Sequence, residues 1–343
     1  MTDSVLPNPI ISGAVATDGR FDGTQDEADS SAELELRRVT VPVGSHGSRL
    51  DRALVGMVPE FSRSYLQQLI EAGVVQLNGV VAAKPSTKTK VGDEVTIELR
   101  PTLQSQAFVP EAMALDIVFE DPYLLIVDKP AGLVVHPAPG NWSGTLLNGL
   151  LARDQQAAFL PRAGIVHRLD KDTSGLMVVA RQRLAMDQLV AMIADRKVSR
   201  EYIGLAHGAW EGARTRQVEE PLGRDPRNRL RMAVVDLEKN SGKTASTVIS
   251  LIHSEGGYCL VKCKLHTGRT HQIRVHMAFL DHPLVGDVLY GGAVAGGLKR
   301  QGLHACRLAF EHPVTGVMLE FKSSPPADLQ VALADLGLIY NQS

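Results

Sequence analysis

The segment Gly164-Ile-Val-His-Arg-Leu-Asp-Lys-Asp-Thr-Ser-Gly175 gathers polar side chains and glycines between hydrophobic stretches. It is followed by the strand-like Leu176–Ala180, so the polar residues occupy a turn that leads into a strand. Carboxylates and hydroxyls in turns commonly bond to nearby backbone, and we favour this structural interpretation for Asp172 and Thr173. From the residues alone, Asp170 is open to the same interpretation.

Strand-like and helical segments continue from this turn in both directions. Helical apolar spacing occurs over Leu184–Ala194, and His271–Leu280 is a second candidate helix. So few helices among many strands do not fit a regular βαβ array, which predicts an α+β domain with a large mixed, mainly antiparallel sheet. The expected strands are Leu115–Phe119, Leu124–Val127, Gly175–Ala180, Tyr202–His207, Thr247–Ile252, Cys259–Leu265, His304–Phe310 and Val317–Lys322.

A smaller module precedes this domain, over residues 39–100. Its apolar residues are spaced as in two helices, and β-like pieces with an Asn78-Gly79 turn follow. The pattern predicts a compact helix-helix-hairpin module, joined by a polar linker over residues 101–112 to a domain of residues 113–343. The elements are indicated by Leu50, Leu54 and Met57, by Tyr65, Leu66, Leu69 and Ile70, and by Val74–Gln76 and Glu94–Leu99.

Residues 1–38 differ from the rest of the chain in composition and charge. They are rich in Asp, Ser, Gly and Ala, and residues 1–36 contain eight acidic residues against the single base Arg20. Their net charge of −7, in a chain of net −2, leaves +5 for residues 37–343. We therefore predict a disordered acidic tail before a mildly basic body, a balance that permits phosphate binding.

Length and composition are those of an ordinary globular protein with about two domains. The 343 residues are 44% hydrophobic and 22% charged, which excludes fibrous and wholly disordered proteins. No apolar run reaches the roughly 18 residues of a membrane helix, and the start lacks a secretory signal, so we expect a cytoplasmic protein with no membrane partner. Sparse cysteine usage favours buried thiols in a reducing compartment, at Cys259, Cys263 and Cys306.

Three segments, in order along the chain, resemble the motifs of one enzyme family. His167-Arg-Leu-Asp170-x-x-Thr173-Ser-Gly175 is similar to the catalytic motif of the RluA/RluD family of pseudouridine synthases. Asp128–Pro137 and His266–His276 resemble two further motifs of that family. An ordered set of matches is far more specific than one short motif, so the chain is identified as a member of this family.

The smaller module extends the resemblance. Arg49-Leu-Asp-Arg52, Ser62-Arg-Ser64 and Val75–Gly79 are similar to an S4-like RNA-binding domain. Ile117–Pro137 and Ala163–Ala180 most resemble the RluD-type members, which modify the large ribosomal subunit. The resemblance thus implies a pseudouridine synthase catalytic fold behind a small α+β S4-like domain, with a stem-loop of large-subunit (23S) ribosomal RNA as partner.

Pseudouridine formation breaks the bond between ribose C1′ and uracil N1, turns the base and rejoins it through C5. Since nothing enters or leaves overall, the resemblance implies no metal, no redox cofactor and no nucleotide cofactor. It assigns the chemistry to Asp170, which would either attack C1′ or remove a proton from C2′. The sequence leaves both routes open.

The resemblance implies two further catalytic residues. Arg274, the second arginine of the downstream motif, would pair with Asp170 and keep it charged and oriented. Tyr202, in Arg200-Glu-Tyr202, corresponds to the active-site tyrosine of the family, expected to stack on the uracil and to assist the proton change at C5. A strand tyrosine is more commonly a core residue, but the motif context favours the active site.

Contacts to RNA are implied in both domains. The target base must leave the stack, and Arg168 is the candidate to fill the gap, with His167 as a lesser contributor. Arg269 would shape the pocket or contact phosphate, with a surface ion pair as the alternative. An RNA stem would be gripped by the S4-like domain, because A-form stems hide their bases while loops expose them. The residues expected to grip it are Arg49, Arg52 and Arg63.

Two motif-based alternatives fail on spacing. Asn240-Ser-Gly-Lys-Thr244 resembles the end of a phosphate-binding loop, but that motif requires glycine where Leu237 stands. A zinc site matches neither paired Cys motifs nor the His-Glu-x-x-His helix. The residues considered for zinc are His266, His271, His276, Cys259 and Cys263.

Other functions stay open as alternatives. The same chemistry could act on transfer RNA, and an S4-like module alone could serve a non-catalytic RNA-binding factor. A glycosylase would share base flipping and the carboxylate but would release free uracil. The presence of Asp170, Tyr202 and Arg274 together favours isomerisation. A monomer is the simplest expectation.

Overall fold

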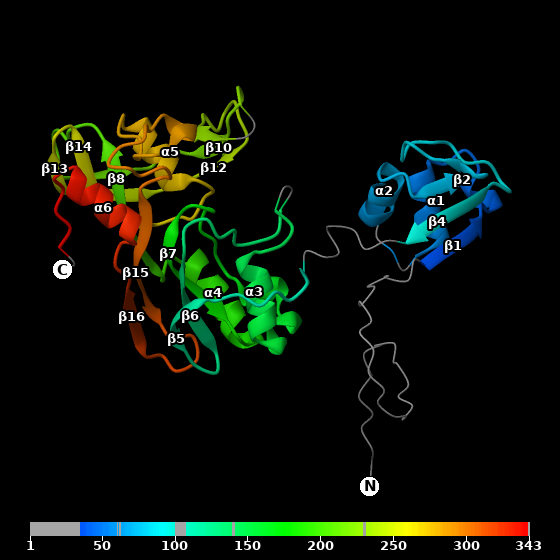
Figure 1. Ribbon diagram of the computed structural model, residues 1–343, viewed down its shortest axis with the longest axis horizontal. Helices are drawn as coiled ribbons and strands as arrows, with labels where there is room; N and C mark the ends of the chain where they lie inside the picture. Colours follow the sequence, from blue (N-terminus) through cyan, green and yellow to red (C-terminus); the bar gives the residue numbers. More distant parts are fainter. Residues whose placement is uncertain are drawn as a thin grey trace, which may run out of the picture. The chain divides into compact units, whose positions relative to one another are not determined.

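The computed structural model describes residues 35–59, 61, 63–99, 108–138, 141–228 and 231–341. The chain divides at residue 100 into two compact units (Figure 1). Most of the predicted tail, residues 1–34, and residues 101–107 of the predicted linker lie outside the described residues. Of the described helices, none is long and apolar enough to cross a membrane.

The first unit is a small α+β domain with one antiparallel sheet of order β1-β4-β2-β3. The predicted apolar spacing forms two helices, whose Leu50, Leu54, Leu66 and Ile70 are fully buried in one cluster with strand residues. The elements are β1 (Glu35–Thr40), a 3-10 helix (Val43–Ser45), α1 (Leu50–Met57), α2 (Arg63–Glu71), β2 (Val75–Leu77), β3 (Val80–Val81) and β4 (Glu94–Leu99).

Strand β1 moves the predicted boundary of the tail. The tail was expected to reach Arg38, whereas β1 begins at Glu35 and pairs antiparallel with β4. Its sequence, ELRRVT, is half charged and merges by composition with the acidic segment before it. Because its hydrogen-bond partner lies far along the chain, local sequence carries little signal for this edge strand.

The second unit contains a nine-stranded sheet of order β5-β6-β7-β15-β8-β14-β13-β9, with β16 also paired to β15. Strands β7 and β15 run parallel, and the other pairs are antiparallel. The predicted α+β class with a mixed, mainly antiparallel sheet is confirmed. The strands are β5 (Asp116–Glu120), β6 (Leu124–Lys129), β7 (Ser174–Ala180), β8 (Ser199–His207), β9 (Thr215–Val218), β13 (Thr247–Glu255), β14 (Tyr258–Leu265), β15 (Leu303–Glu311) and β16 (Met318–Lys322).

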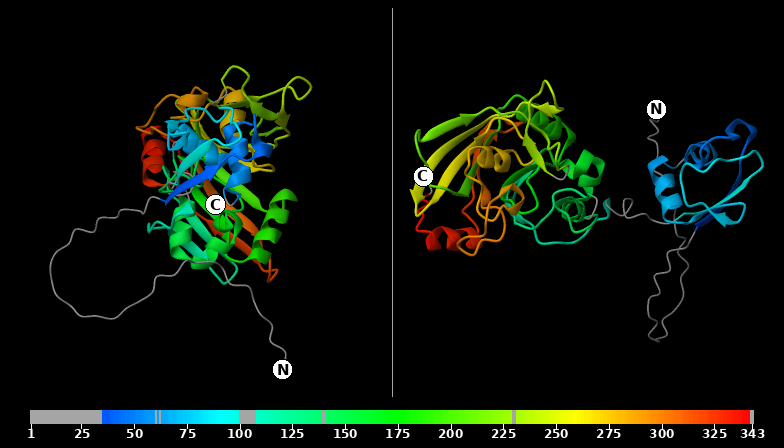
Figure 2. Two further views of the ribbon diagram at one scale, coloured as in Figure 1. Left: turned by 90° about the vertical axis from the view of Figure 1, so that its right-hand side faces the viewer. Right: turned by 90° about the horizontal axis from the view of Figure 1, so that it is seen from above.

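Helices cover both faces of this sheet. Helices α3 (Leu146–Arg153) and α5 (Gln272–Phe279) pack on the face that carries Tyr202. Helices α4 (Arg183–Ala194) and α6 (Ala327–Asp335) pack on the opposite face, and Figure 2 shows α6 in red beside the long strands β13 and β14. Helices α4 and α5 were predicted, but α3 and α6 were not.

Shorter elements complete the second unit. A three-stranded sheet of β10 (Leu222–Arg224), β11 (Met232–Val234) and β12 (Gly242–Lys243) packs against α5. The segment rejected above as a phosphate loop therefore contains a strand. Single 3-10 turns occupy Gln155–Phe159, Pro161–Gly164 and Val288–Tyr290.

Three neighbouring strands bring the motif residues together. Strand β7 starts directly after the Asp170 loop, β8 carries Tyr202, and β15 lies between them. Gly175 permits the close approach of β7 to β15, since a Cβ there would lie 2.3 Å from the carbonyl oxygen of Ala305 and φ is +113°. The sheet order thus places sequence-distant residues on one surface.

Candidate active site

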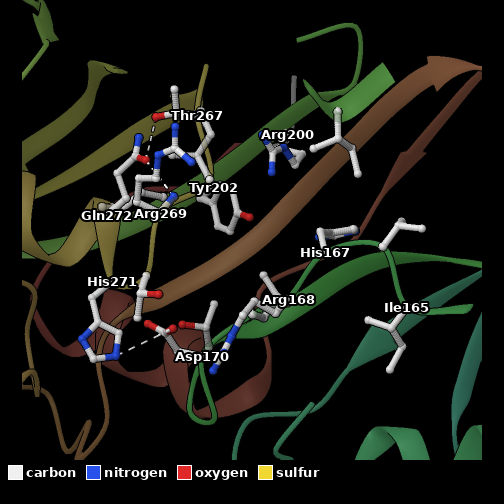
Figure 3. Close-up of a pocket in the computed structure, with 18 of the residues that line it drawn as sticks. Ile165, His167, Arg168, Asp170, Arg200, Tyr202, Thr267, Arg269, His271 and Gln272 are labelled. Carbon is white, nitrogen blue, oxygen red and sulfur yellow. Dashed lines mark hydrogen bonds and ion pairs between the residues drawn. The ribbon is translucent and has the colours of Figure 1, made fainter. Parts of the chain in front are cut away.

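A cavity of about 750 Å³ lies in the second unit, on the sheet face that carries Tyr202. Figure 3 shows Asp170 and Arg168 on one loop, with Tyr202 and Arg200 on the sheet above them. Among the described lining residues, Asp170 is the one carboxylate and six are arginines. These arginines are Arg162, Arg168, Arg196, Arg200, Arg269 and Arg274.

A buried lysine holds the loop that carries Asp170 in place. Lys129 is fully buried and donates hydrogen bonds from Nζ to the carbonyl oxygens of Pro130, Leu133 and Lys171, at 2.8, 2.8 and 2.9 Å. The backbone N–H of Thr173 closes the turn by donating to the carbonyl of Asp170 at 3.1 Å. Lys129 therefore connects the upstream motif to the loop that carries Asp170.

The carboxylate of Asp170 has unused bonding capacity. Arg274 donates from Nη1 to Oδ2 of Asp170 at 3.2 Å. Oδ1 lies 3.9 Å from Nε2 of His271, too far for a hydrogen bond, and accepts none from the described residues. One oxygen is thus oriented while the other faces the cavity.

Arg274 is held by a second carboxylate. Its Nε and Nη2 donate to Oδ2 and Oδ1 of Asp287 at 2.7 and 2.8 Å, and its guanidinium lies 4.9 Å from the ring centre of Tyr290. Burial acts to lower the pKa of Arg274, but hydrogen bonds and charge from Asp287, with a smaller share from Asp170, raise it overall. A bidentate pair of this kind sets the direction in which Nη1 points.

A neutral histidine completes this side of the cavity. The hydroxyl of Tyr290 accepts from the backbone N–H of Met232 at 3.0 Å and bonds to Nδ1 of His271 at 2.8 Å. Burial lowers the pKa of His271, although the charge of Asp170 acts against this shift. If the phenol donates to Nδ1, the proton of neutral His271 is on Nε2, which lies 3.9 Å from Oδ1 of Asp170.

Tyr202 presents its ring from β8 and is 5% exposed. Burial raises the pKa of Tyr202 to about 12; the Arg200 charge opposes this shift and the Asp170 charge adds to it. The side chain is therefore a neutral phenol near pH 7, with its apolar ring available for a planar base.

The structure places the three predicted RNA-contacting residues of this domain around the same cavity. Arg168 lines it and is exposed. His167 lines it too, but its Nε2 accepts from the backbone N–H of Val178 at 3.1 Å, which fixes the ring against β7. Arg269 donates from Nε to the carbonyl of Thr244 at 3.1 Å, a hydrogen bond that anchors it at the cavity wall.

Other polar residues of the downstream motif have structural contacts. Gln272 accepts from the hydroxyl of Thr267 at 2.7 Å and donates to Thr247 at 2.8 Å, while His276 bonds to that same Thr247 hydroxyl at 2.9 Å. These bonds fasten the start of α5 to β13. Across the described ranges, no group of three or more His, Cys, Asp or Glu side chains is arranged to hold a metal ion. The three cysteines are free and buried, as expected.

In the first unit, two of the three predicted RNA-gripping arginines bind a buried carboxylate. Arg49 donates to Oδ1 and Oδ2 of Asp51 at 3.0 and 3.2 Å, and Arg63 donates to Oδ2 at 3.2 and 2.8 Å. Gln67 adds a further bond at 2.6 Å, and Asp51 is fully buried. Arg52, in contrast, is exposed on α1.

Sequence reasoning missed four residues of the cavity or its support. Asp287 and Tyr290 follow α5 in a loop with no motif of their own, so their link to Arg274 exists only in three dimensions. His271 was considered as a zinc ligand, and a core or RNA-facing position was preferred for it. Arg200 alternates with Tyr202 on one strand, and that period of two was the available signal.

Taken together, the geometry defines an enzyme class: one carboxylate with a free oxygen, in a cavity rich in arginine, suits chemistry on an anionic polymer. Family models give the class its name. The model of RNA pseudouridylate synthase matches residues 123–279, and that of the S4 domain matches residues 48–95.

Two relatives agree with these matches. The protein named ribosomal large subunit pseudouridine synthase D from Neisseria meningitidis serogroup A is 45% identical over 93% of this chain and 88% of its own length. Its namesake from Xylella fastidiosa is 45% identical over 88% of this chain and 92% of its own. The chain belongs to the pseudouridine synthase family, is an isomerase, and carries an S4 domain.

A solved structure supports the fold. Human RNA pseudouridylate synthase domain containing 4 is 22% identical, covers 66% of this chain and 95% of its own, and superimposes with a TM-score of 0.52. The family models and the relatives confirm the family predicted from the three motifs, and this structure supports the fold.

Proposed function

We propose that this enzyme isomerises specific uridines of large-subunit (23S) ribosomal RNA to pseudouridine, with Asp170 as the catalytic carboxylate. The observation that carries the proposal is the unbonded Oδ1 of Asp170 in an arginine-rich cavity that also holds the ring of Tyr202. The names of the relatives support the ribosomal target, because they match along about nine-tenths of this chain.

Asp170 acts through Oδ1, which accepts no hydrogen bond from the described residues. Arg274 occupies Oδ2 and balances the charge, so Oδ1 is the atom that attacks C1′ or takes the proton from C2′. Asp287 keeps Arg274 in position during either step. Both routes rupture the bond from C1′ to N1 and leave the uracil in the cavity to turn.

The detached base needs a surface on which to rotate. Tyr202 offers a flat apolar ring, and its phenol stays protonated near neutral pH, so the hydroxyl can take part in the proton change at C5. Arg168, exposed at the same cavity, fills the space that the flipped nucleotide vacates. Arg269 lines the wall and contacts the RNA backbone.

The S4 domain grips the stem that presents the target loop. Arg52 is exposed, while Arg49 and Arg63 use Nε and Nη2 for Asp51 and reach phosphate with Nη1. The enzyme works as a monomer in the cytoplasm, where large-subunit RNA is assembled.

The decisive experiment maps pseudouridines in total RNA from cells with and without this protein. Uridines of large-subunit ribosomal RNA should lose modification in its absence and regain it with the wild-type chain. Modification confined to transfer RNA would refute the ribosomal target. Purified enzyme should leave RNA mass unchanged and release no uracil, whereas free uracil would indicate a glycosylase.

Removal of residues 35–99 tests the division of labour between the domains. Site selection on full-length ribosomal RNA should suffer more than turnover of a short stem-loop, because the catalytic cavity lies wholly in the second unit. Deletion of residues 1–34 is the matched control: it removes seven of the eight acidic residues of the tail and should leave turnover nearly unchanged. Equal behaviour of all three proteins on ribosomal RNA would contradict a role of the S4 domain in recognition.

A further inference from the structure

Arg200 is a buried cation for which the described residues provide no partner. Its side chain lies on β8 and the residue is 6% exposed. Its Nε has no hydrogen-bond partner, and the described part of the chain places no carboxylate within ion-pair distance of it. Its neighbour Glu201 points to the other face of the sheet and pairs there with Arg307 at 2.9 Å.

The cavity is shaped to accept this guanidinium. Arg200 and Tyr202 are two residues apart on one strand, so both face the cavity with their Cα atoms about 7 Å apart. Gly268 of the downstream motif leaves space for the head group, since a Cβ there would lie 2.8 Å from Nη1 of Arg200. A motif residue thus makes room for a charge that nothing in the described chain balances.

His167 provides a second unsatisfied donor in the same wall. Because its Nε2 accepts from the N–H of Val178, the proton of the neutral ring is on Nδ1, which is buried and has no partner. Burial, with a smaller share from the charge of Arg200, lowers the pKa of His167 to about 3. His167 is therefore neutral at working pH, and Arg200 is the uncompensated cation of this wall.

A buried, unpaired guanidinium is unfavourable in the free protein, and its retention calls for a ligand that pairs with it. Uracil is neutral and cannot balance the charge. The anion that RNA brings is a phosphodiester, whose oxygens match the guanidinium fork. Arg274, in contrast, already has Asp287.

We propose that Arg200 binds a phosphodiester of the substrate RNA next to the target uridine, while the base of that nucleotide lies on Tyr202. This inference rests on the proposed function and adds a substrate-binding residue to it. Arg200 and Tyr202 then contact one nucleotide at two points, an adjacent phosphate and the base. Free enzyme is destabilised by the same cation that substrate neutralises.

The test couples a protein variant to a substrate variant. Wild-type and Arg200→Met enzymes are assayed on a synthetic stem-loop that contains a uridine mapped as above, with either natural phosphates or one uncharged methylphosphonate at each position flanking that uridine. On natural RNA, Arg200→Met should lower kcat/KM about 100-fold, as expected for a lost charged hydrogen bond. On RNA with the contacted phosphate neutralised, the same variant should differ from wild type less than about threefold.

Three controls separate this role from a structural one. Arg307→Met removes an arginine from the other sheet face and should change kcat/KM less than about threefold. Arg200→Met should melt at the wild-type temperature or above, because it removes an unpaired buried charge. The slope of log Kd against log salt should fall by roughly 0.7 in the variant, which is the contribution of one phosphate contact in single-stranded RNA.

The inference is overturned if the loss caused by Arg200→Met is the same on natural RNA and on every methylphosphonate RNA, since Arg200 would then contact the base or support the fold. A lower melting temperature with unchanged kcat/KM would also overturn it. Failure of the wild-type enzyme to form pseudouridine in this stem-loop would instead count against the proposed function.

Discussion

Two aspartates, one in each unit, are paired with arginine and differ in how completely they are bonded. Asp51 of the first unit is fully buried and accepts bonds from Arg49, Arg63 and Gln67. Asp170 of the second unit keeps 17% of its side chain exposed and accepts one bond, from Arg274. Both are Asp–Arg pairs, but of the two only Asp170 has an oxygen that accepts no hydrogen bond from the described part of the chain.

The difference in bonding indicates a structural role for Asp51 and a chemical role for Asp170. Burial acts to raise the pKa of Asp51, but its hydrogen-bonding neighbours outweigh burial and leave that pKa well below the usual value. All the bonding capacity of that carboxylate stabilises the fold. Arg274 makes its bidentate pair with Asp287 and gives Asp170 a single hydrogen bond. That bond orients the carboxylate of Asp170 and leaves one of its oxygens able to accept another bond. Spare capacity at a fixed position is the property that a nucleophile or base requires.

Substitution of Asp170 should give the largest effect on activity. Asp170→Asn keeps the shape and removes the charge, so kcat should fall by at least about 10⁴-fold with RNA binding largely intact, as for the loss of a reacting group. Since Arg274 still has Asp287, the melting temperature should change little. Single-turnover assays and thermal melts check this, and substantial turnover by the variant would remove Asp170 from the mechanism.

Substitution of Asp51 should lower the stability of the first unit and leave turnover nearly unchanged. Asp51→Ala removes the hydrogen bonds that Arg49, Arg63 and Gln67 donate to one carboxylate and should destabilise the first unit by about 1–3 kcal/mol. The loss stays below that of a fully buried ion pair, because both arginines are about half exposed and remain hydrated. Turnover of a short stem-loop should change far less than that of Asp170→Asn. Urea unfolding of the isolated first unit and of the full chain measures the loss, and a variant as stable as wild type would contradict the structural role of the pair.

Asp287 tests whether indirect orientation matters. Asp287→Asn weakens the bidentate hold on Arg274, so kcat should drop roughly 10- to 100-fold, the usual range for supporting residues of a site. Addition of Arg274→Lys to this variant should cost little more, because both changes disrupt one unit. If the two losses multiply instead, Asp287 acts independently of Arg274.

The smallest effect concerns acid stability and His167. The pKa of His167 is lowered from 6.5 to about 3, so between these pH values the unfolded chain takes up a proton that the folded chain refuses. Stability is therefore lost as pH falls below about 6.5, by at most roughly 1.4 kcal/mol per pH unit from this group. His167→Asn should flatten the dependence of melting temperature on pH between 6.5 and 5 relative to wild type. An unchanged slope would show that other histidines dominate.

Much of this molecule is predictable from sequence, for identifiable reasons. Short segments rich in apolar residues predicted β7, β8, β13, β14 and β15, because strands buried against helices carry a strong local pattern. Helix α3 escaped prediction because it contains Gly149, a weak helix former that lies against Met113 from outside the helix. The strand order, with β15 between β7 and β8, has no local signal at all.

Some residues of the cavity could be predicted from the sequence, and others could not. Motif resemblance predicted Asp170, Tyr202 and Arg274, and the structure brings the three into one cavity, while their roles stay predictions. Asp287 could not be predicted, since its importance lies in a contact with Arg274 and not in its own surroundings in the sequence. Arg49 and Arg63 were predicted to face RNA, and the sequence did not reveal that both form ion pairs with Asp51.

The position of β15 governs when during synthesis the enzyme can become active. Strands β7 and β8, which present Asp170 and Tyr202, are joined through β15, a segment made about a hundred residues later. A nascent chain that stops before Leu303 has no central strand to set the two residues side by side, whereas the S4 domain has all its described strands by residue 99. RNA binding can therefore precede catalysis on the growing chain. An enzyme that installs its central strand so late cannot modify RNA until that strand has been made.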